Sequence, residues 1–414
     1  MMRTIGALVM LVETVLLTQH LVFAQAFSSG STGALGALNA TTNQTITLPA
    51  DGVLNYTTIT VAAGVTVQFT ANTLNTPVTM LATGDVTING TIAVNGQAGA
   101  GGSSSGAVVL AGGTGGPGGY RGGNGGSRGA TNNTGAAGQG PGGGNVAVTA
   151  FEVWGVPGYS AVVNLLPLFG GSGGGGAVGN GTYSGSSGGG GGGAIVIGST
   201  TQITINSTGA ITALGGDGGV GQQGCGTSYG GGGSGGGIRL VAPKITNLGN
   251  LQATGGSTAC NPATVNAAGR IRIESHVTGT ILNTNPTASI VTSPGPITAA
   301  SRPALINLPT LAISTVAGAS VPANPGGSYT TADVTLPGGT TNPVSVVTAE
   351  TNTPVPGSPA TTVWMKVLPQ FAAPTTTSTT TLTGTFANST ATNSVTLPNG
   401  AISVLQGYSA MFLP

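Results

Sequence analysis

Residues 188–193 are six consecutive glycines, and they lead directly into the apolar segments 194–197 (AIVI) and 202–205 (QITI). Glycine has no side chain to bury and loses more backbone entropy on folding than any other residue, so this tract cannot form a helix or an ordinary core. The segments that emerge from it are typical of β-strands. Two interpretations remain for the glycine itself: solvated loop between strands, or extended polyproline-II-like backbone packed where only a bare Cα fits.

A strand-turn-strand repeat accompanies the glycine. Its copies start at Asp85 (DVTINGTIAVNG), Gln202 (QITINSTGAITALGG) and Lys244 (KITNLGNLQATGG). A glycine-rich excursion follows each copy, and its length varies. Because the strands are constant and the excursions are not, the variation belongs to one side of a regular scaffold.

A second type of strand closes the repeating unit. It aligns on its apolar positions in residues 194–197, 238–241 and 270–273, and residues 144–148 resemble an earlier copy. Such a pattern describes a solenoid, in which each layer buries a face only by stacking on the next. We therefore predict an all-β fold with a parallel β-helix (solenoid) carrying long Gly-rich loops over residues 27–285.

The N-terminal residues have the pattern of an export signal peptide. Arg3 supplies a positive charge, residues 5–23 are mostly apolar, and residues 24–26 (AQA) form a small-residue cleavage site. A membrane anchor is the alternative, but three polar residues within the apolar stretch make it poor for spanning. We predict a signal peptide over residues 1–26, a mature chain from Phe27, and no membrane insertion after cleavage.

Composition narrows the class of partner. Only 4% of the residues are charged, the formal net charge is +1, and 39% are hydrophobic. Nucleic acids and anionic membranes are held through many charge contacts, so neither is expected as a partner. A chain this apolar does not have the composition of a disordered protein either. We expect a secreted all-β protein.

The chain has two cysteines, Cys225 and Cys260. A lone pair in an exported protein usually forms a disulfide, and each cysteine lies in a glycine-rich loop after a comparable strand. We predict a disulfide that staples these loops. With His276 as the one histidine beyond the signal peptide, ligands are too few for a metal site, and no cofactor is expected.

The glycine content falls from residue 286 onward. We predict a linker over residues 286–310 and a small immunoglobulin-like β-sandwich over residues 311–414, with Trp364 in its core. Short alternating segments separated by Pro, Gly and Asn support this assignment. The predicted strands are 332–336, 344–348, 361–368, 377–386, 394–397 and 402–411.

The acidic residues are scattered and form no close pair along the chain. Glycoside hydrolysis needs two carboxylates that flank one bond. Stacking of layers can bring acids and arginines together that are distant in the sequence, so a polysaccharide-degrading enzyme is retained as the least favoured alternative. Gly-x-Gly-x-x-Gly matches occur throughout the glycine tracts without a following helix, which argues against nucleotide binding. We predict no catalytic residues.

Arg239 and Arg272 occupy equivalent positions in successive strands, between apolar residues. Strand alternation places both on the outer face, about 4.8 Å apart. Like charges this close must share an anion or a carboxylate. Glu274 lies two residues after Arg272 on the same face, which favours a local ion pair. An acidic-sugar site at Arg239 and Arg272 is the alternative.

Residues 151–169 interrupt the repeat with an apolar, aromatic segment that contains Trp154 and Tyr159. It could form a cap, a lid over the glycine loops, or a binding patch. In a carbohydrate-binding protein, Trp154 and Tyr159 would be stacking residues beside the two arginines, together with Tyr120 and Tyr183.

Glycine excursions that alternate with strands such as residues 86–92 (VTINGTI) resemble the secreted glycine-rich parallel β-helix proteins of bacteria. The resemblance covers about residues 55–275 and implies a structural role at the cell surface or outside the cell. We therefore expect a secreted, non-catalytic structural or adhesive protein that self-associates into fibres or matrix. The runner-up is a carbohydrate-binding surface protein whose partner is an extracellular polysaccharide. Ice binding would require a flat Thr-x-Thr array, which the variable loops do not suggest.

Overall fold

The computed structural model describes residues 27–104, 109–128, 135–144, 165, 168–180, 182–221, 229–258, 261–265, 267–292, 310–323, 325, 331–351, 361–370, 374–385 and 387–411. In these ranges the regular structure is β-strand and includes no helix, which confirms the all-β prediction. The predicted signal peptide and residues 293–309 of the predicted linker lie outside the described residues.

A ten-stranded parallel sheet is the larger part of what we call the strand stack. Its members are β1 (Leu38–Ala40), β3 (Val53–Tyr56), β4 (Ile59–Val61), β6 (Val78–Ala82), β7 (Val86–Ile88), β9 (Ala194–Ser199), β10 (Gln202–Ile205), β12 (Gly237–Asn247), β16 (Arg270–Ile281) and β18 (Ser289–Thr292). The long strand β12 joins two lines of shorter strands, because its first half pairs with β9 and its second half pairs with β10. Strand β16 pairs along the other edge of β12.

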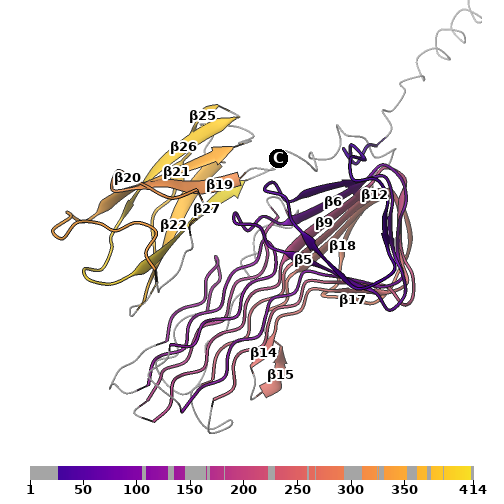
Figure 1. Ribbon diagram of the computed structural model, residues 1–414. Coiled ribbons are helices and arrows are strands. Elements are labelled where there is room, and N and C mark those ends of the chain that lie inside the picture. The colour runs from indigo at the N-terminus through magenta and orange to yellow at the C-terminus, as the bar shows by residue number, and fades with distance from the viewer. Residues whose placement is uncertain are drawn as a thin grey trace, which may run out of the picture.

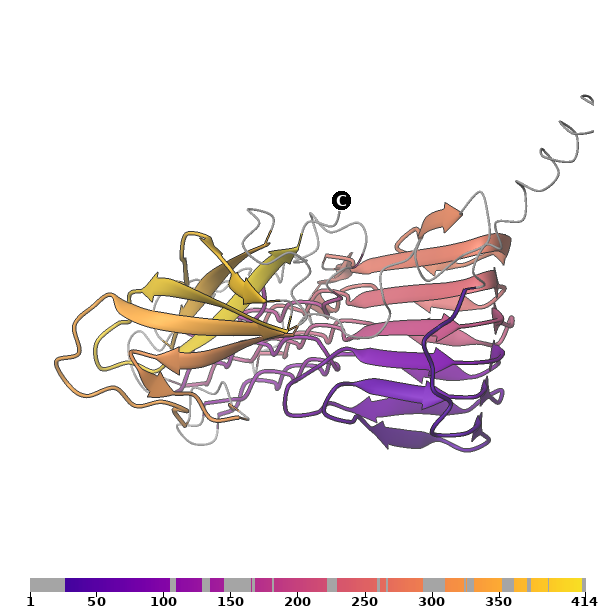
Figure 2. The same ribbon diagram turned by 90° about the horizontal axis from the view of Figure 1, so that it is seen from above.

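A six-stranded parallel sheet completes the strand stack. Its members are β2 (Gln44–Thr47), β5 (Thr66–Thr70), β8 (Thr91–Ala93), β11 (Ala210–Thr212), β13 (Asn250–Gln252) and β17 (Thr284–Asn285). The chain returns to this sheet once per layer, and Figure 2 shows the layers stacked in chain order. Both sheets contribute to one buried apolar cluster, which includes Ile59, Ile92 and Ile203.

The registers place equivalent positions of the predicted repeats side by side. The three lines are Val86–Ile203–Ile245, Ile92–Ile211–Leu251 and Ile195–Ile238–Ile271. All of these side chains are buried, whereas Thr87 and Thr204 between them are partly exposed. The two-residue period of the sequence therefore separates the inside of the stack from its outside.

The glycine tracts leave the stack between β8 and β9, between β11 and β12, and between β13 and β16. We call the described extended segments within residues 95–193, 213–236 and 253–258 the glycine bundle. Figure 1 shows them running side by side away from the stack. A short strand pair, β14 (Ser257–Thr258) with β15 (Asn261–Val265), lies in the last excursion.

The glycine bundle is packed backbone, not solvated loop. Hydrogen bonds join two of its antiparallel segments at every third residue, from the N–H of residues 193, 190, 187 and 184 to the carbonyl oxygens of residues 94, 97, 100 and 103, at 2.6–3.0 Å. Parallel segments follow the same step, from residues 96, 99 and 102 to residues 214, 217 and 220, each at 2.8 Å. Three residues per turn is the period of polyproline-II backbone.

At many interior positions of this bundle only glycine fits. A Cβ added to Gly233 would lie 2.0 Å from the carbonyl oxygen of Gly190, and one added to Gly190 would lie 2.1 Å from that of Thr114. Neither neighbour can move alone, because each is backbone held by further hydrogen bonds. The composition noted in the sequence therefore reflects a steric requirement.

The C-terminal unit consists of two antiparallel sheets. One contains β19 (Thr310–Val316), β20 (Ala319–Ser320), β21 (Val344–Thr351), β25 (Thr383–Thr385) and β26 (Asn388–Val395); the other contains β22 (Thr361–Pro369), β23 (Thr375–Thr376), β24 (Thr380–Thr381) and β27 (Ser403–Met411). Val346 of the first sheet and Met365 of the second belong to one buried cluster. The two sheets therefore share a core.

Two expectations for this unit are wrong. Residues 332–336 form no strand, although Val334 and Leu336 pack on the core. The alternation of apolar residues in this segment therefore reflects the burial of side chains and is not accompanied by strand pairing. Pro337, which lacks an N–H, follows directly. Trp364 is only partly buried and lies between the inward-facing Val363 and Met365, on the opposite face of β22.

The steric requirement can be tested at one interior glycine. We expect Gly233→Ala to lower the free energy of unfolding by about 1–3 kcal/mol, because overpacked backbone must shift to accept the methyl group. Gly338 is the matched control, since a Cβ there meets nothing within 4 Å. Gly338→Ala should change stability by less than about 0.5 kcal/mol. Equal denaturant midpoints for the two variants would contradict close packing of the bundle.

Candidate functional site: the buried ion cluster and the docking face

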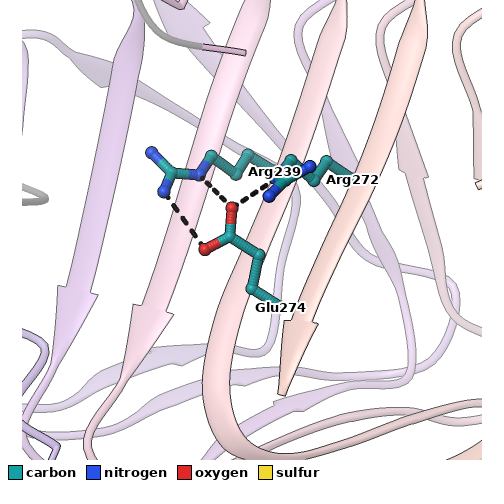
Figure 3. A network of polar contacts seen from close by, with 3 residues as sticks. All are labelled: Arg239, Arg272 and Glu274. Carbon is teal, nitrogen blue, oxygen red and sulfur yellow. Dashed lines mark hydrogen bonds and ion pairs between the residues drawn. The ribbon is translucent and has the colours of Figure 1, made fainter. Parts of the chain in front are cut away.

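Arg239 on β12 and Arg272 on β16 are direct neighbours across the pair of strands, as the sequence predicted. Both direct their guanidinium groups to Glu274 (Figure 3). Arg239 donates from Nε to Oε1 of Glu274 at 3.1 Å and from Nη2 to Oε2 at 3.2 Å, and Arg272 donates from Nε to Oε1 at 2.5 Å. We call these three residues the ion cluster. Its carboxylate is the shared counter-ion that the sequence required.

The ion cluster is withdrawn from solvent. Arg239, Arg272 and Glu274 are 2%, 9% and 1% exposed. Burial by itself would raise the pKa of the Glu274 carboxyl, but the charges and hydrogen bonds of Arg239 and Arg272 outweigh it and hold that pKa below its usual value. The carboxylate is therefore ionised at neutral pH. An acidic ligand would have to displace Glu274 to bind both arginines.

An apolar cover lies on the outer face of the ten-stranded sheet near the ion cluster. Phe27, Leu165 and Leu168 pack there against Val196 of β9 and Val241 of β12. The described end of segment 151–169 thus covers the sheet, as a cap or lid would. Phe27, the predicted first residue of the mature chain, is 4% exposed in this contact.

Other predicted site residues fall into two groups. Trp154, Tyr159, Cys225 and Cys260 lie outside the described residues, as do residues 145–148 of the suggested earlier strand copy. Tyr120 lies in the glycine bundle against Tyr408 of the C-terminal unit, with ring centroids 6.2 Å apart. Burial raises the pKa of the Tyr120 hydroxyl well above its usual range. Tyr120 is therefore not an exposed stacking residue for sugars.

The contact around Tyr120 and Tyr408 is a docking face that the sequence did not predict. The backbone N–H of Gly140 in the bundle donates to Oε1 of Gln406 at 2.8 Å, and Nζ of Lys366 donates to the carbonyl oxygen of Gly140 at 3.0 Å. The Tyr408 hydroxyl donates to the same Gln406 oxygen at 2.6 Å. Strands β22 and β27 thus bind both polar groups of one glycine.

Apolar and aromatic contacts surround these hydrogen bonds. Ala136 and Ala137 of the bundle form a buried cluster with Leu368 and Val404 of the C-terminal unit. Trp364 stacks on Tyr408, with centroids 5.6 Å apart and ring planes 29° apart. Burial at this face also lowers the pKa of Lys366. No local signal marks these residues, because their partner is glycine backbone 266 positions away from Gln406.

Comparisons with protein-family models, curated proteins and solved structures found no match to this chain. Within the described ranges, no three or more His, Cys, Asp or Glu side chains are grouped so that they could hold a metal ion. A search of the same ranges finds no helix long and apolar enough to cross a membrane. Function must therefore be argued from the geometry of this chain alone.

The ion cluster should make stability depend on pH. Because the native pKa of Glu274 is lower than its unfolded value, the unfolded state binds more protons, and stability falls as pH drops through the lowered pKa, below the usual value of 4.5. We expect Glu274→Gln to cost about 3–5 kcal/mol at pH 7, since it leaves two buried arginines without a carboxylate. Urea unfolding at pH 7 and pH 3 measures this.

The difference between wild type and Glu274→Gln should shrink at pH 3, because the carboxyl of the unfolded wild-type chain is then protonated and the stability that comes from its lowered native pKa is reduced. Lys244→Gln is the control, because Lys244 is an exposed charge on β12 outside the ion cluster. It should change the free energy of unfolding by less than about 0.5 kcal/mol at either pH. A Glu274→Gln deficit that is the same at both pH values would rule out an ionised cluster.

The docking face can be tested through one amide. Gln406→Ala removes the acceptor of the Gly140 N–H, so hydrogen exchange at Gly140 should become faster. The Gly174 amide, bonded to the Gly189 carbonyl inside the bundle, is the internal reference and should exchange as before. Unchanged exchange at Gly140 would show that the C-terminal unit does not dock there in solution.

Proposed function

We propose that this chain is a secreted, non-catalytic structural or adhesive protein of the cell surface or extracellular space, and that it self-associates into fibres or matrix. The observation that carries this proposal is the glycine bundle. A large part of the chain is committed to a packed array built mainly of glycine backbone. The hydroxyls of Ser172, Ser187 and Ser234 inside it accept hydrogen bonds from backbone N–H groups of the same array. Such an array suits rigid extension away from the strand stack.

The proposed function includes a proposed architecture for the strand stack and the C-terminal unit. We propose that the strand stack is a parallel β-helix (solenoid), supported by three lines of parallel strands that the chain visits in a fixed order. The C-terminal unit is proposed to be a β-sandwich of immunoglobulin-like type, supported by its two antiparallel sheets and shared core. Together these form a stiff rod with a lateral bundle and an attached domain.

The surroundings of three acids favour a non-catalytic role. Asp85 accepts hydrogen bonds from Thr201 and Gln202, which lower its pKa. Asp217 accepts the backbone N–H and hydroxyl of Ser257. Glu274 is held in the ion cluster. Each carboxylate thus serves local structure, whereas hydrolysis of a glycosidic bond requires two that face one substrate.

A specific observation favours carbohydrate binding as the second candidate. Asn43, Gln44, Thr45, Thr66 and Gln68 line a hollow of about 330 Å³ at the first layers of the six-stranded sheet. Their amides and hydroxyls are suitable partners for the hydroxyl groups of a neutral sugar. This hollow is a more accessible candidate than the ion cluster, whose arginines are already occupied by Glu274.

The first test is negative-stain electron microscopy with size-exclusion light scattering on the mature chain from Phe27. We expect fibres or concentration-dependent oligomers. Release of reducing or unsaturated sugar ends from polysaccharides would overturn the non-catalytic assignment. A glycan array tests the second candidate: retention that Gln68→Ala abolishes would favour the hollow, and retention that Trp154→Ala abolishes would favour the aromatic segment.

A further inference from the structure

Both ends of the strand stack leave strand edges open. Within the described residues, β1 and β2 of the first layer pair on one side only. Strand β3, one layer further in, pairs with β6, and on its other edge the Asn55 carbonyl oxygen accepts a hydrogen bond from the Leu35 N–H. At the last layer, β17, β18 and the second half of β16 likewise pair on one side. Unpaired backbone N–H and C=O groups on such edges are templates for further strands.

The apolar core is open at the same two ends. Leu38 and Ile46 at the first end, and Ile281 and Ala288 at the last end, pack against the core cluster but are only partly buried. Ile290 on β18 is 47% exposed, although its register partner Ile273 is fully buried. Core positions that a further layer would bury thus face solvent at both ends.

The two ends match each other in strand direction and order. The line that starts with β3 ends with β18, the line that starts with β1 ends with the second half of β16, and the line that starts with β2 ends with β17. All pairings within these lines are parallel. A second copy moved along the stack axis would therefore continue the lines of β1 and β2 without reversing any strand, whereas residues 35 and 36 already bond to part of the outer edge of β3.

The edges also lack the residues that normally protect a sheet. Natural edge strands often carry Lys or Pro, which oppose the addition of another strand. None of the six edge segments contains a charged residue or a proline: LNA, QTIT and VLNY at the first end, and VTGTI, TN and SIVT at the last. Within these segments themselves, neither a charge nor a missing N–H opposes stacking, and the nearby acid Asp51 accepts the Val53 N–H at the β3 edge.

We propose that the last layer of one copy of this chain binds the first layer of a second copy, head to tail, through parallel strand pairing and a continuous apolar core. This inference rests on the proposed structural role and specifies the surface and partner for it. A head-to-tail contact uses two different surfaces, so it leaves one of each free and propagates as an open filament.

Two variants block the two ends separately. The Leu48 N–H donates to Thr70 on β5. Because successive residues of a strand direct their backbone groups to opposite sides, the Thr45 N–H faces the open edge, and Thr45→Pro removes only that donor. Ile290→Lys places a charge on the partly exposed core position of the last layer. Val220→Lys is the matched control, since Val220 is 49% exposed but lies in the glycine bundle.

Light scattering of the mature full chain measures the mass of the particles that it forms. We expect wild type and Val220→Lys to form concentration-dependent oligomers, and Thr45→Pro and Ile290→Lys each to remain monomeric. A 1:1 mixture of the two blocked variants should give particles of twice the monomer mass and no larger, because one free first end meets one free last end. Formation of that dimer also shows that both variants are folded.

Several results would overturn the inference. If either blocked variant alone assembles like wild type, the contact is lateral or joins like ends. A wild-type chain that stays monomeric at every concentration also overturns it. If wild type forms fibres that both variants still form, head-to-tail stacking fails while the proposed structural role stands.

Discussion

The close approach of backbone to backbone in the glycine bundle is the constraint on which the rest of the molecule depends. Excursions leave neighbouring layers of the strand stack, so they begin at the spacing of paired strands, about 4.8 Å. Gly193, Gly236 and Gly269 lie on one another just before strands β9, β12 and β16. A Cβ on Gly236 or Gly269 would lie 1.8 Å from the carbonyl oxygen of the glycine beneath it. At that separation the segments pair through their own peptide groups, and these positions have no room for a side chain.

The strand stack and the bundle therefore require each other. The stack fixes the register in which excursions start, and the bundle satisfies the backbone groups that a long excursion would otherwise expose to water. The ion cluster belongs to the stack side of this arrangement. Register alone brings Arg239 beside Arg272, and the penalty of two buried like charges is offset only because Glu274 lies on the same face, two residues further along.

Features set by local alternation could be predicted from the sequence, and features set by distant contacts could not. The strand repeats, the burial of their isoleucines and the pairing of both arginines with Glu274 follow from a two-residue period and equivalent positions. The choice between packed and solvated glycine needed the hydrogen bonds themselves, because polyglycine has no side-chain pattern. The docking face could not be predicted for the same reason. Lys366 and Gln406 bind the peptide groups of Gly140, and no sequence motif identifies that glycine as their partner. The prediction that Trp364 lies in the core was wrong because alternation along β22 does not say which of its two faces packs against the other sheet.

The low charge of the chain is consistent with the proposed association of its copies. It has nine Lys and Arg and eight Asp and Glu in 414 residues, with a net charge of +1. Some of these are not on the surface at all, because Arg239, Arg272, Glu274, Glu350 and Lys366 are buried. Net charge keeps most soluble proteins apart, and a surface of threonine, asparagine and glycine with few ions supplies little repulsion. Association is then limited mainly by shape and hydrogen bonding. The proposed head-to-tail contact uses the ends of the parallel sheets and their core, where both are available.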